Sequence, residues 1–184
     1  MTALFVFIAV VVLLLLYFVS IHNSLVKNRN LVEEAWSVIN VLLKKRYELI
    51  PNLVETVKGY AKHEKETLEN VINARNQSEN ASDLQGKQIA ENKLTQAITN
   101  LFALVENYPD LKANTNFLAF QTELSNLETD IEKARRYYNG TVRQYNTKIE
   151  IFPNNSFAAI YNFKKADFFE LDDTAEKQVP KVNF

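Results

Sequence analysis

Few side chains in this chain have the type and spacing to support chemistry. His63 and Glu64 would need a second histidine one turn later to complete the H-E-x-x-H zinc motif, but residue 67 is Thr. We therefore expect the stretch around His63 to be a charged, solvated helix surface. The other histidine, His22, follows an apolar N-terminal run, and we expect it at a membrane interface.

Several classes of enzyme lack their residues in this sequence. The chain has no Cys, no G-x-S-x-G segment and only three glycines, too few for a phosphate-binding loop. Its net charge of −1 provides no basic field for nucleic acid. On a helix, Arg135 and Tyr138 would also face differently from Arg136 and Tyr137. The sequence therefore predicts a protein that is not an enzyme, holds no cofactor or metal and binds no nucleic acid.

Two charged residues interrupt an otherwise apolar helical seam. A buried unpaired charge is costly, so Arg46 and Glu64 must each be paired or face water. A structural salt bridge or a device that fixes chain register is favoured over a functional role. Pro51 lies in the same seam, and we expect it to kink the helix, because the seam keeps its phase on both sides. The kink frees a backbone carbonyl, which Asn52 is expected to satisfy.

An uninterrupted apolar run extends from Ala3 to Val19. With its neighbours through residue 21 it reaches about 31 Å as a helix, enough to cross the hydrocarbon core of a bilayer. An uncleaved anchor is favoured over a cleaved signal peptide, because no basic residue precedes the run and no A-x-A-like site follows it. The expected membrane-spanning residues are Leu4, Phe5, Val6, Phe7, Ile8, Val10, Val11, Val12, Leu13, Leu14, Leu15, Leu16, Tyr17, Phe18 and Val19.

Basic residues follow this run, first Lys27 and Arg29 and then the cluster at 44–46. The positive-inside rule places the basic side of a span in the cytoplasm. We therefore expect a single-pass protein of the cell inner (cytoplasmic) membrane, with its N-terminus outside and its helical bundle in the cytoplasm.

Behind the anchor, apolar residues recur every three or four positions, as is typical of amphipathic helices. The first such seam runs from Val32 to Val71 and includes Trp36, whose ring we expect to be largely buried. A turn is expected at residues 76–83, with Ser82 and Gln85 as a capping box.

Two more helices follow in the pattern. We expect one over 84–107, stopped by Pro109, and a longer one over 115–152, stopped by Pro153. A short helix is expected within 154–163, followed by a fraying tail.

The third helix should exceed the second by roughly 20 Å at 1.5 Å per residue. Its excess carries an apolar and aromatic stripe that the second helix cannot cover, and an exposed stripe of that kind marks an interface. The candidate oligomer interface is Tyr138, Val142, Tyr145, Ile149 and Phe152. The alternative is that the segment 157–163 folds back over the stripe within one chain.

Four strings together resemble the LemA family of membrane-anchored bacterial proteins: RNLVEEAW at 29–36, KRYELIPNLVETVKGYAKHE at 45–64, AENKLTQAITNLFALVENYPDLKANTNF at 90–117 and ARRYYNGTVRQYNTKIEIFP at 134–153. The resemblance covers residues 25 to about 170. It implies an N-terminal membrane helix and a bundle of four antiparallel helices, and it brings no established enzymatic activity. Relatives of the family occur in bacterial organelle biogenesis. Near the C-terminus, YNFKKADFFE stands where a Gly-Phe pair and an aromatic-Phe-Glu end are usual.

The expected fold class is all-α, with one N-terminal transmembrane helix continuing into a long antiparallel four-helix bundle. The expected organisation is an anchor at 1–21, a bundle at 22–163 and a charged tail at 164–184. We expect a non-enzymatic, membrane-anchored scaffold that self-associates and organises membrane or partner proteins. The alternative is an accessory or adaptor subunit that docks a membrane enzyme or signalling protein. Its expected partners are the lipid bilayer, further copies of the chain in a homo-oligomer, and a protein still to be identified.

Overall fold

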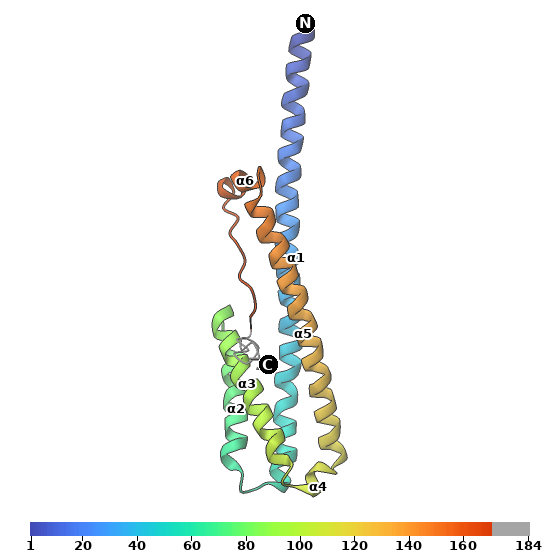
Figure 1. Ribbon diagram of the computed structural model, residues 1–184, viewed down its shortest axis with the longest axis vertical. Helices are drawn as coiled ribbons and strands as arrows, with labels where there is room; N and C mark the ends of the chain where they lie inside the picture. Colours follow the sequence, from blue (N-terminus) through green and yellow to red (C-terminus); the bar gives the residue numbers. More distant parts are fainter. Residues whose placement is uncertain (171–184) are drawn as a thin grey trace, which may run out of the picture. The chain divides into compact units, whose positions relative to one another are not determined.

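A computed structural model describes residues 1–170 of the chain. Within that range the backbone forms six α-helices and no strand, in the order shown in Figure 1. The helices are α1 (Thr2–Tyr60), α2 (Lys65–Asn80), α3 (Leu84–Val105), α4 (Pro109–Lys112), α5 (Thr115–Glu150) and α6 (Asn154–Ile160). The all-α fold class expected from the sequence is confirmed.

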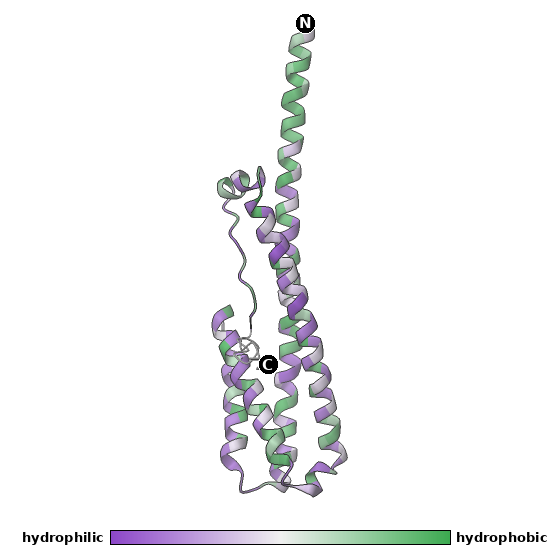
Figure 2. Cartoon of the chain, viewed as in Figure 1, coloured by the Kyte–Doolittle hydropathy of each residue, from purple (hydrophilic) through white to green (hydrophobic). Residues whose placement is uncertain are grey.

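The apolar N-terminal run forms the first part of α1. This helix is long and apolar enough to cross a membrane. Residues 1–20 are all exposed, and the apolar colouring of this stretch in Figure 2 runs around the whole helix. A helix that is apolar on every side and buried by no protein is typical of a membrane span. Helix α1 is therefore a candidate anchor.

The chain divides into two compact units, to which α1 and α5 both contribute. The first unit consists of residues 1–40 and 133–168, and residues 41–132 form the main part of the second unit.

In the first unit, α1 and α5 pack in antiparallel directions. The rings of Trp36 and Tyr138 lie 5.5 Å apart, and Lys148 Nζ donates a hydrogen bond of 2.9 Å to Ser24 Oγ. Leu25 and Val142 are fully buried between these contacts. The ring of Trp36 keeps part of its surface exposed, so it is less buried than expected.

An extended segment after α6 is also part of the first unit. Asn146 of α5 binds the backbone of Ala166 twice, through its Nδ2 to the Ala166 oxygen and through its Oδ1 to the Ala166 nitrogen, each at 2.9 Å. Tyr138 donates its hydroxyl to the Asp167 oxygen at 2.9 Å. The expectation that the chain frays from residue 164 is therefore wrong up to residue 167, because side chains of α5 satisfy this backbone. The rest of the expected tail, from residue 171, lies outside the described residues.

The expected exposed stripe on the long helix is mostly buried within one chain. Tyr138, Val142, Tyr145 and Ile149 are at most 9% exposed, and only Phe152 is open, at 82%. Contacts with α1 and with residues 166–167 cover this face. From the sequence, the first helix and another copy of the chain were both possible covers. The premise that an uncovered stripe marks the oligomer interface is therefore wrong, while self-association itself stays a prediction.

The second unit contains four long helical segments, namely 41–60 of α1, α2, α3 and 115–132 of α5. Their apolar faces meet in a core whose most buried members include Leu43, Ile50, Leu53, Val57, Val71, Leu94, Leu101, Phe117 and Leu124. Between α3 and α5, the rings of Phe102 and Phe117 lie 6.1 Å apart. This arrangement agrees with the four-helix bundle that the family resemblance implies.

Two local features of the second unit differ from expectation. The first seam does not continue as one helix to Val71, because the chain turns at residues 61–64 and α2 runs back along α1. The N-cap of α3 is Asp83, whose side chain accepts a hydrogen bond from the Gly86 nitrogen, so the expected capping box at Ser82 is wrong. Pro109 occupies the first turn of the short helix α4, where its missing N–H costs nothing.

Candidate functional site

A buried cluster of polar side chains lies in the core of the second unit. Arg46 Nη1 is 3.3 Å from Glu91 Oε2, Arg46 Nε is 3.0 Å from Glu128 Oε1, and Arg46 Nη2 donates to Thr95 Oγ1 at 2.8 Å. Tyr47 donates its hydroxyl to the other oxygen of Glu91. The Arg46 and Glu91 side chains are 3% and 2% exposed. The prediction that Arg46 must be paired if it is buried is confirmed.

Burial controls the ionisation of this cluster. The pKa of Glu91 is raised because its carboxylate is removed from water, and the hydrogen bond from Tyr47 and the charge of Arg46 offset only part of that cost. The pKa of the Tyr47 phenol is raised by burial and by the neighbouring Glu91 charge. Neither group has access to solvent for proton exchange with a substrate, so the cluster is suited to holding helices in register rather than to acid–base catalysis.

The interruption at Pro51 is resolved by a residue from another helix. Proline lacks an N–H, so the carbonyl of Tyr47, four residues earlier, loses its helical partner. Arg75 of α2 supplies the replacement, donating from Nε to the Tyr47 oxygen at 3.2 Å. Helix α1 continues through Pro51 without a break. Asn52 is exposed and its own carbonyl accepts from Thr56, so the expectation that Asn52 satisfies the freed carbonyl is wrong.

The cluster and the Pro51 site together connect all four long segments of the second unit. Arg46 and Tyr47 come from α1, Arg75 from α2, Glu91 from α3 and Glu128 from α5. The sequence pattern identified Arg46 but not Glu91. A signal for Glu91 was present, because it lies three residues before Leu94 and so occupies the core-facing side of α3.

The residues considered for a metal site are not gathered into one. His63 is exposed in the turn before α2, and Glu64, at the N-cap of α2, accepts a hydrogen bond from the Tyr108 hydroxyl at 3.0 Å. The Glu64 oxygen thus raises the pKa of the Tyr108 phenol. Among residues 1–170, no group of three or more His, Cys, Asp or Glu could hold a metal ion.

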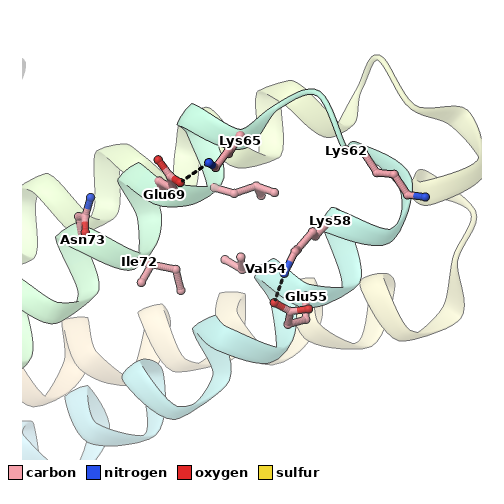
Figure 3. Close-up of a pocket in the computed structure, with 9 residues that line it drawn as sticks. Val54, Glu55, Lys58, Lys62, Lys65, Glu69, Ile72 and Asn73 are labelled. Atoms are coloured by element: carbon pink, nitrogen blue, oxygen red, sulfur yellow. Dashed lines mark hydrogen bonds and ion pairs between the residues drawn. The ribbon is translucent and has the colours of Figure 1, made fainter.

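A groove lies on the surface of the second unit, between the last turns of α1 and the first turns of α2 (Figure 3). It has a volume of ≈ 570 Å³ and an apolar floor formed by Val54, Leu68 and Ile72. Figure 3 shows Val54 and Ile72 pointing into it from opposite helices. We refer to this feature as the α1–α2 groove.

An ion pair stands on each side of the α1–α2 groove. On α1, Lys58 Nζ lies 2.9 Å from Glu55 Oε1, and on α2, Lys65 Nζ lies 3.5 Å from Glu69 Oε1. All four side chains are more than half exposed. The groove therefore combines an apolar floor with polar edges of both signs, which is the pattern of a protein interface.

The expected membrane-spanning residues, Leu4 to Val19, are all exposed along the first part of α1. His22, expected at a membrane interface, packs its ring against Tyr161 and Phe163, with centroids 4.9 and 5.8 Å away. The ring contacts explain why His22 is partly buried.

Comparison with known proteins gives the chain a family. It matches the LemA family over residues 35–184. It is 30% identical over 170 residues to Protein LemA of Metamycoplasma hominis, a match that covers 87% of this chain and 78% of that protein. The chain belongs to the LemA family. This membership indicates a membrane-associated helical protein, in agreement with the exposed apolar part of α1, and the LemA family is not a known enzyme family.

Shorter stretches of this LemA-family chain are similar to magnetosome proteins. It is 34% identical over 74 residues to Magnetosome protein MamQ 2 of Paramagnetospirillum magneticum. It is 30% identical over 73 residues to Magnetosome protein MamQ of Magnetospirillum gryphiswaldense. Each match covers 40% of this chain and 27% of the relative, so it concerns a segment of those proteins and not their whole length.

Proposed function

We propose that this protein is a non-enzymatic scaffold, anchored in the cell inner membrane by α1, that self-associates through the α1–α2 groove and organises membrane or partner proteins. The observation that carries the proposal is the groove itself. Its floor is apolar, formed by Val54, Leu68 and Ile72, and exposed charged side chains of α1 and α2 stand beside it. An apolar floor within polar edges favours a protein ligand over a small charged one.

The charges beside the groove favour a second copy as its occupant. Each of the two helices carries one Lys and one Glu at the edge, so the surface presents both signs on both sides. A surface of that kind can meet itself across a two-fold axis with opposite charges facing each other. A membrane anchor also confines copies to two dimensions, which raises their effective concentration without any new contact.

The mass of the full-length protein in mild detergent or lipid nanodiscs tests self-association. We expect a multiple of the 21.2 kDa chain. Ile72→Glu places a charge on the floor of the groove and should reduce the particle to one chain with unchanged helicity. Ile89→Glu is the matched control, because Ile89 of α3 is 52% exposed and does not line the groove. A wild-type particle of one chain, or an Ile72→Glu variant that stays associated, contradicts the proposal.

A second candidate is an adaptor subunit that docks a membrane enzyme or signalling protein. The burial of Tyr138, Val142 and Tyr145 within one chain favours it, because that face needs no second copy to cover it. A photo-cross-linking residue at position 72 separates the candidates in living cells. A product of two chains supports the scaffold, and a single product of another mass, lost in a variant carrying the probe at position 89, supports the adaptor.

The orientation is part of the same proposal. Lys27 and Arg29 follow the apolar run closely, so the positive-inside rule favours a bundle in the cytoplasm. A reporter that fluoresces only in the cytoplasm, fused to the C-terminus, should be bright. Alkaline phosphatase fused at the same point should be inactive, and the reverse result contradicts this orientation.

A further inference from the structure

The corner between α5 and α6 exposes an unusual number of apolar side chains. We define the α5–α6 corner as residues 151–161. Ile151 is 49% exposed, Phe152 82%, Ile160 74% and Tyr161 56%. Four such side chains within eleven residues form a surface that water solvates poorly, and patches of this kind mark contacts with proteins or membranes.

The α5–α6 corner lies beside the end of the apolar run, within the first unit. The ring of Phe157 is 4.7 Å from the ring of Phe18, and the ring of Tyr161 is 4.9 Å from that of His22. Figure 1 shows α6 next to α1 at this level, and Figure 2 shows that the continuous apolar colouring of α1 ends there.

These contacts fix the depth of the corner relative to a membrane. Phe18 is the last residue but one of the apolar run, so in a spanning helix it lies where the hydrocarbon core gives way to the headgroups. A ring that touches Phe18 must lie at nearly the same depth. Aromatic side chains are enriched at that level, because their amphipathic rings suit the boundary between headgroups and acyl chains.

Polar residues of the corner, and cations outside it, suit the same boundary. Asn154, Asn155 and Ser156 begin α6 and present polar groups. Lys164 is exposed just beyond the corner, and the Arg29 guanidinium lies over the ring of Phe163, 5.5 Å from its centroid. Cations on the water side of an apolar surface are complementary to lipid phosphates.

We propose that the α5–α6 corner is a second membrane contact, seated in the interfacial layer of the bilayer that α1 crosses. Its partner is the boundary between lipid headgroups and acyl chains, where Phe152 and Ile160 bury their side chains. The first unit then has two points of attachment, the span and the corner. Two attachments hold it against rotation about the axis of the span, whereas a span alone is a simple tether.

The absence of native cysteine allows a direct test on the full chain. Phe152→Cys and, separately, Ile160→Cys are labelled with a nitroxide and reconstituted in phosphatidylcholine–phosphatidylglycerol vesicles at a low ratio of protein to lipid. Tyr137→Cys is the matched control, because Tyr137 is an aromatic residue of α5 in the same unit and is 57% exposed. The quantities measured are the collision rates of each label with oxygen, which concentrates in lipid, and with a water-soluble nickel complex.

We expect labels at 152 and 160 to collide several-fold less with nickel, and more with oxygen, than the label at 137. Equal rates at all three positions overturn the proposal. Shielding of 152 and 160 that disappears when the protein is diluted further with lipid also overturns it, because the cover is then another copy of the chain. The inference requires α1 to span a bilayer but not the scaffold function, whose failure would appear separately in the particle mass.

Discussion

Glu91 is the residue on which the polar core of the second unit depends. Its two oxygens are shared between the Arg46 guanidinium and the Tyr47 hydroxyl, and its side chain is 2% exposed. A buried ion pair adds little net stability when formed, because desolvation offsets the attraction. Removing one member of the pair lowers the free energy of unfolding much more, because the other charge is then left in the core without that partner. The main role of the cluster is therefore to specify which helices pack together. Its net contribution to the free energy of unfolding is small.

Glu91→Leu should lower the free energy of unfolding by about 3–5 kcal/mol, because it leaves Arg46 with one fewer counter-charge and Tyr47 without an acceptor. Urea unfolding of the full-length protein in detergent, followed by circular dichroism, measures the change. The control is Glu48→Leu, since the Glu48 side chain is 63% exposed and its pairing with Lys44 should contribute at most a few tenths of a kcal/mol. A loss at Glu91 no larger than the loss at Glu48 would contradict the structural role.

The raised pKa of Glu91 predicts a pH dependence of known sign. The folded protein binds this proton more tightly than the unfolded chain, whose carboxyl keeps the ordinary value of 4.5. The stabilisation from Glu91 is thus fully present below pH 4.5 and is lost as the pH rises through the folded pKa. Compared with Glu91→Gln, the wild type should lose stability over that window. Urea unfolding of both proteins at a series of pH values measures this, and a difference that grows in favour of the wild type contradicts it.

The sequence predicts that Arg46 belongs to a buried polar pair, but it does not identify the partner. Arg46 interrupts an apolar seam, and the cost of a buried charge demands a partner for it. The partner lies 45 residues away on α3, and helical periodicity gives the face of each helix but not which positions on two helices come together. Glu91 could have been suspected from its core-facing position, whereas Thr95 and Glu128 carried no signal.

At the scale of elements, α1 remains one helix across Pro51 because a side chain of α2 replaces the hydrogen bond that the proline cannot make. The missing N–H of Pro51 leaves the Tyr47 carbonyl in a largely buried position, and an unpaired buried carbonyl costs more than a formed hydrogen bond gains. Arg75 supplies the donor. The proline therefore makes the stability of α1 depend on the correct placement of α2.

A double-mutant cycle tests this dependence. Arg75→Met should lower the free energy of unfolding by about 1–3 kcal/mol, because the Tyr47 carbonyl loses its donor. In a Pro51→Ala background the restored N–H at position 51 bonds that carbonyl, so Arg75→Met should cost clearly less. Urea unfolding of the four proteins gives the coupling energy. Equal costs of Arg75→Met in both backgrounds would show that Arg75 acts through its contacts with Glu79 and Asn76 and not through the Tyr47 carbonyl.

The helices themselves were largely predictable, and the connections were less so. Apolar periodicity located α3 and α5 to within about two residues, and proline ended or began elements where expected. The reversal at 61–64 was missed, because it contains neither proline nor glycine and the apolar spacing of α2 continues that of α1 in phase. The sequence left open whether the first helix or another copy of the chain covers the α5 stripe, since the choice depends on contacts between distant segments.

On the scale of the whole molecule, the side chains of α1 change from exposed to partly buried near residue 20. Residues 1–20 are all exposed, whereas Ile21 is 6% exposed and Leu25 is fully buried. The buried positions from Ile21 onward find their partners in other described parts of the chain. Residues 2–17 are thus a continuation of the α1 backbone that contributes no buried side chain, although they belong to the same helix as the packed part.

Deleting residues 2–17 should therefore release a folded, helical protein from the membrane. The deletion removes no buried side chain and keeps Phe18 and His22, which contact α6. The α5–α6 corner alone presents four exposed apolar side chains, and stable attachment to a membrane takes more than one weak signal of that size. We expect the variant in the soluble fraction, with the helicity per residue and the urea midpoint of the second unit unchanged. A variant that is insoluble or unfolded would show that the span takes part in folding, and a folded variant that still sediments fully with vesicles would show that the corner is a stronger anchor than its exposed surface indicates.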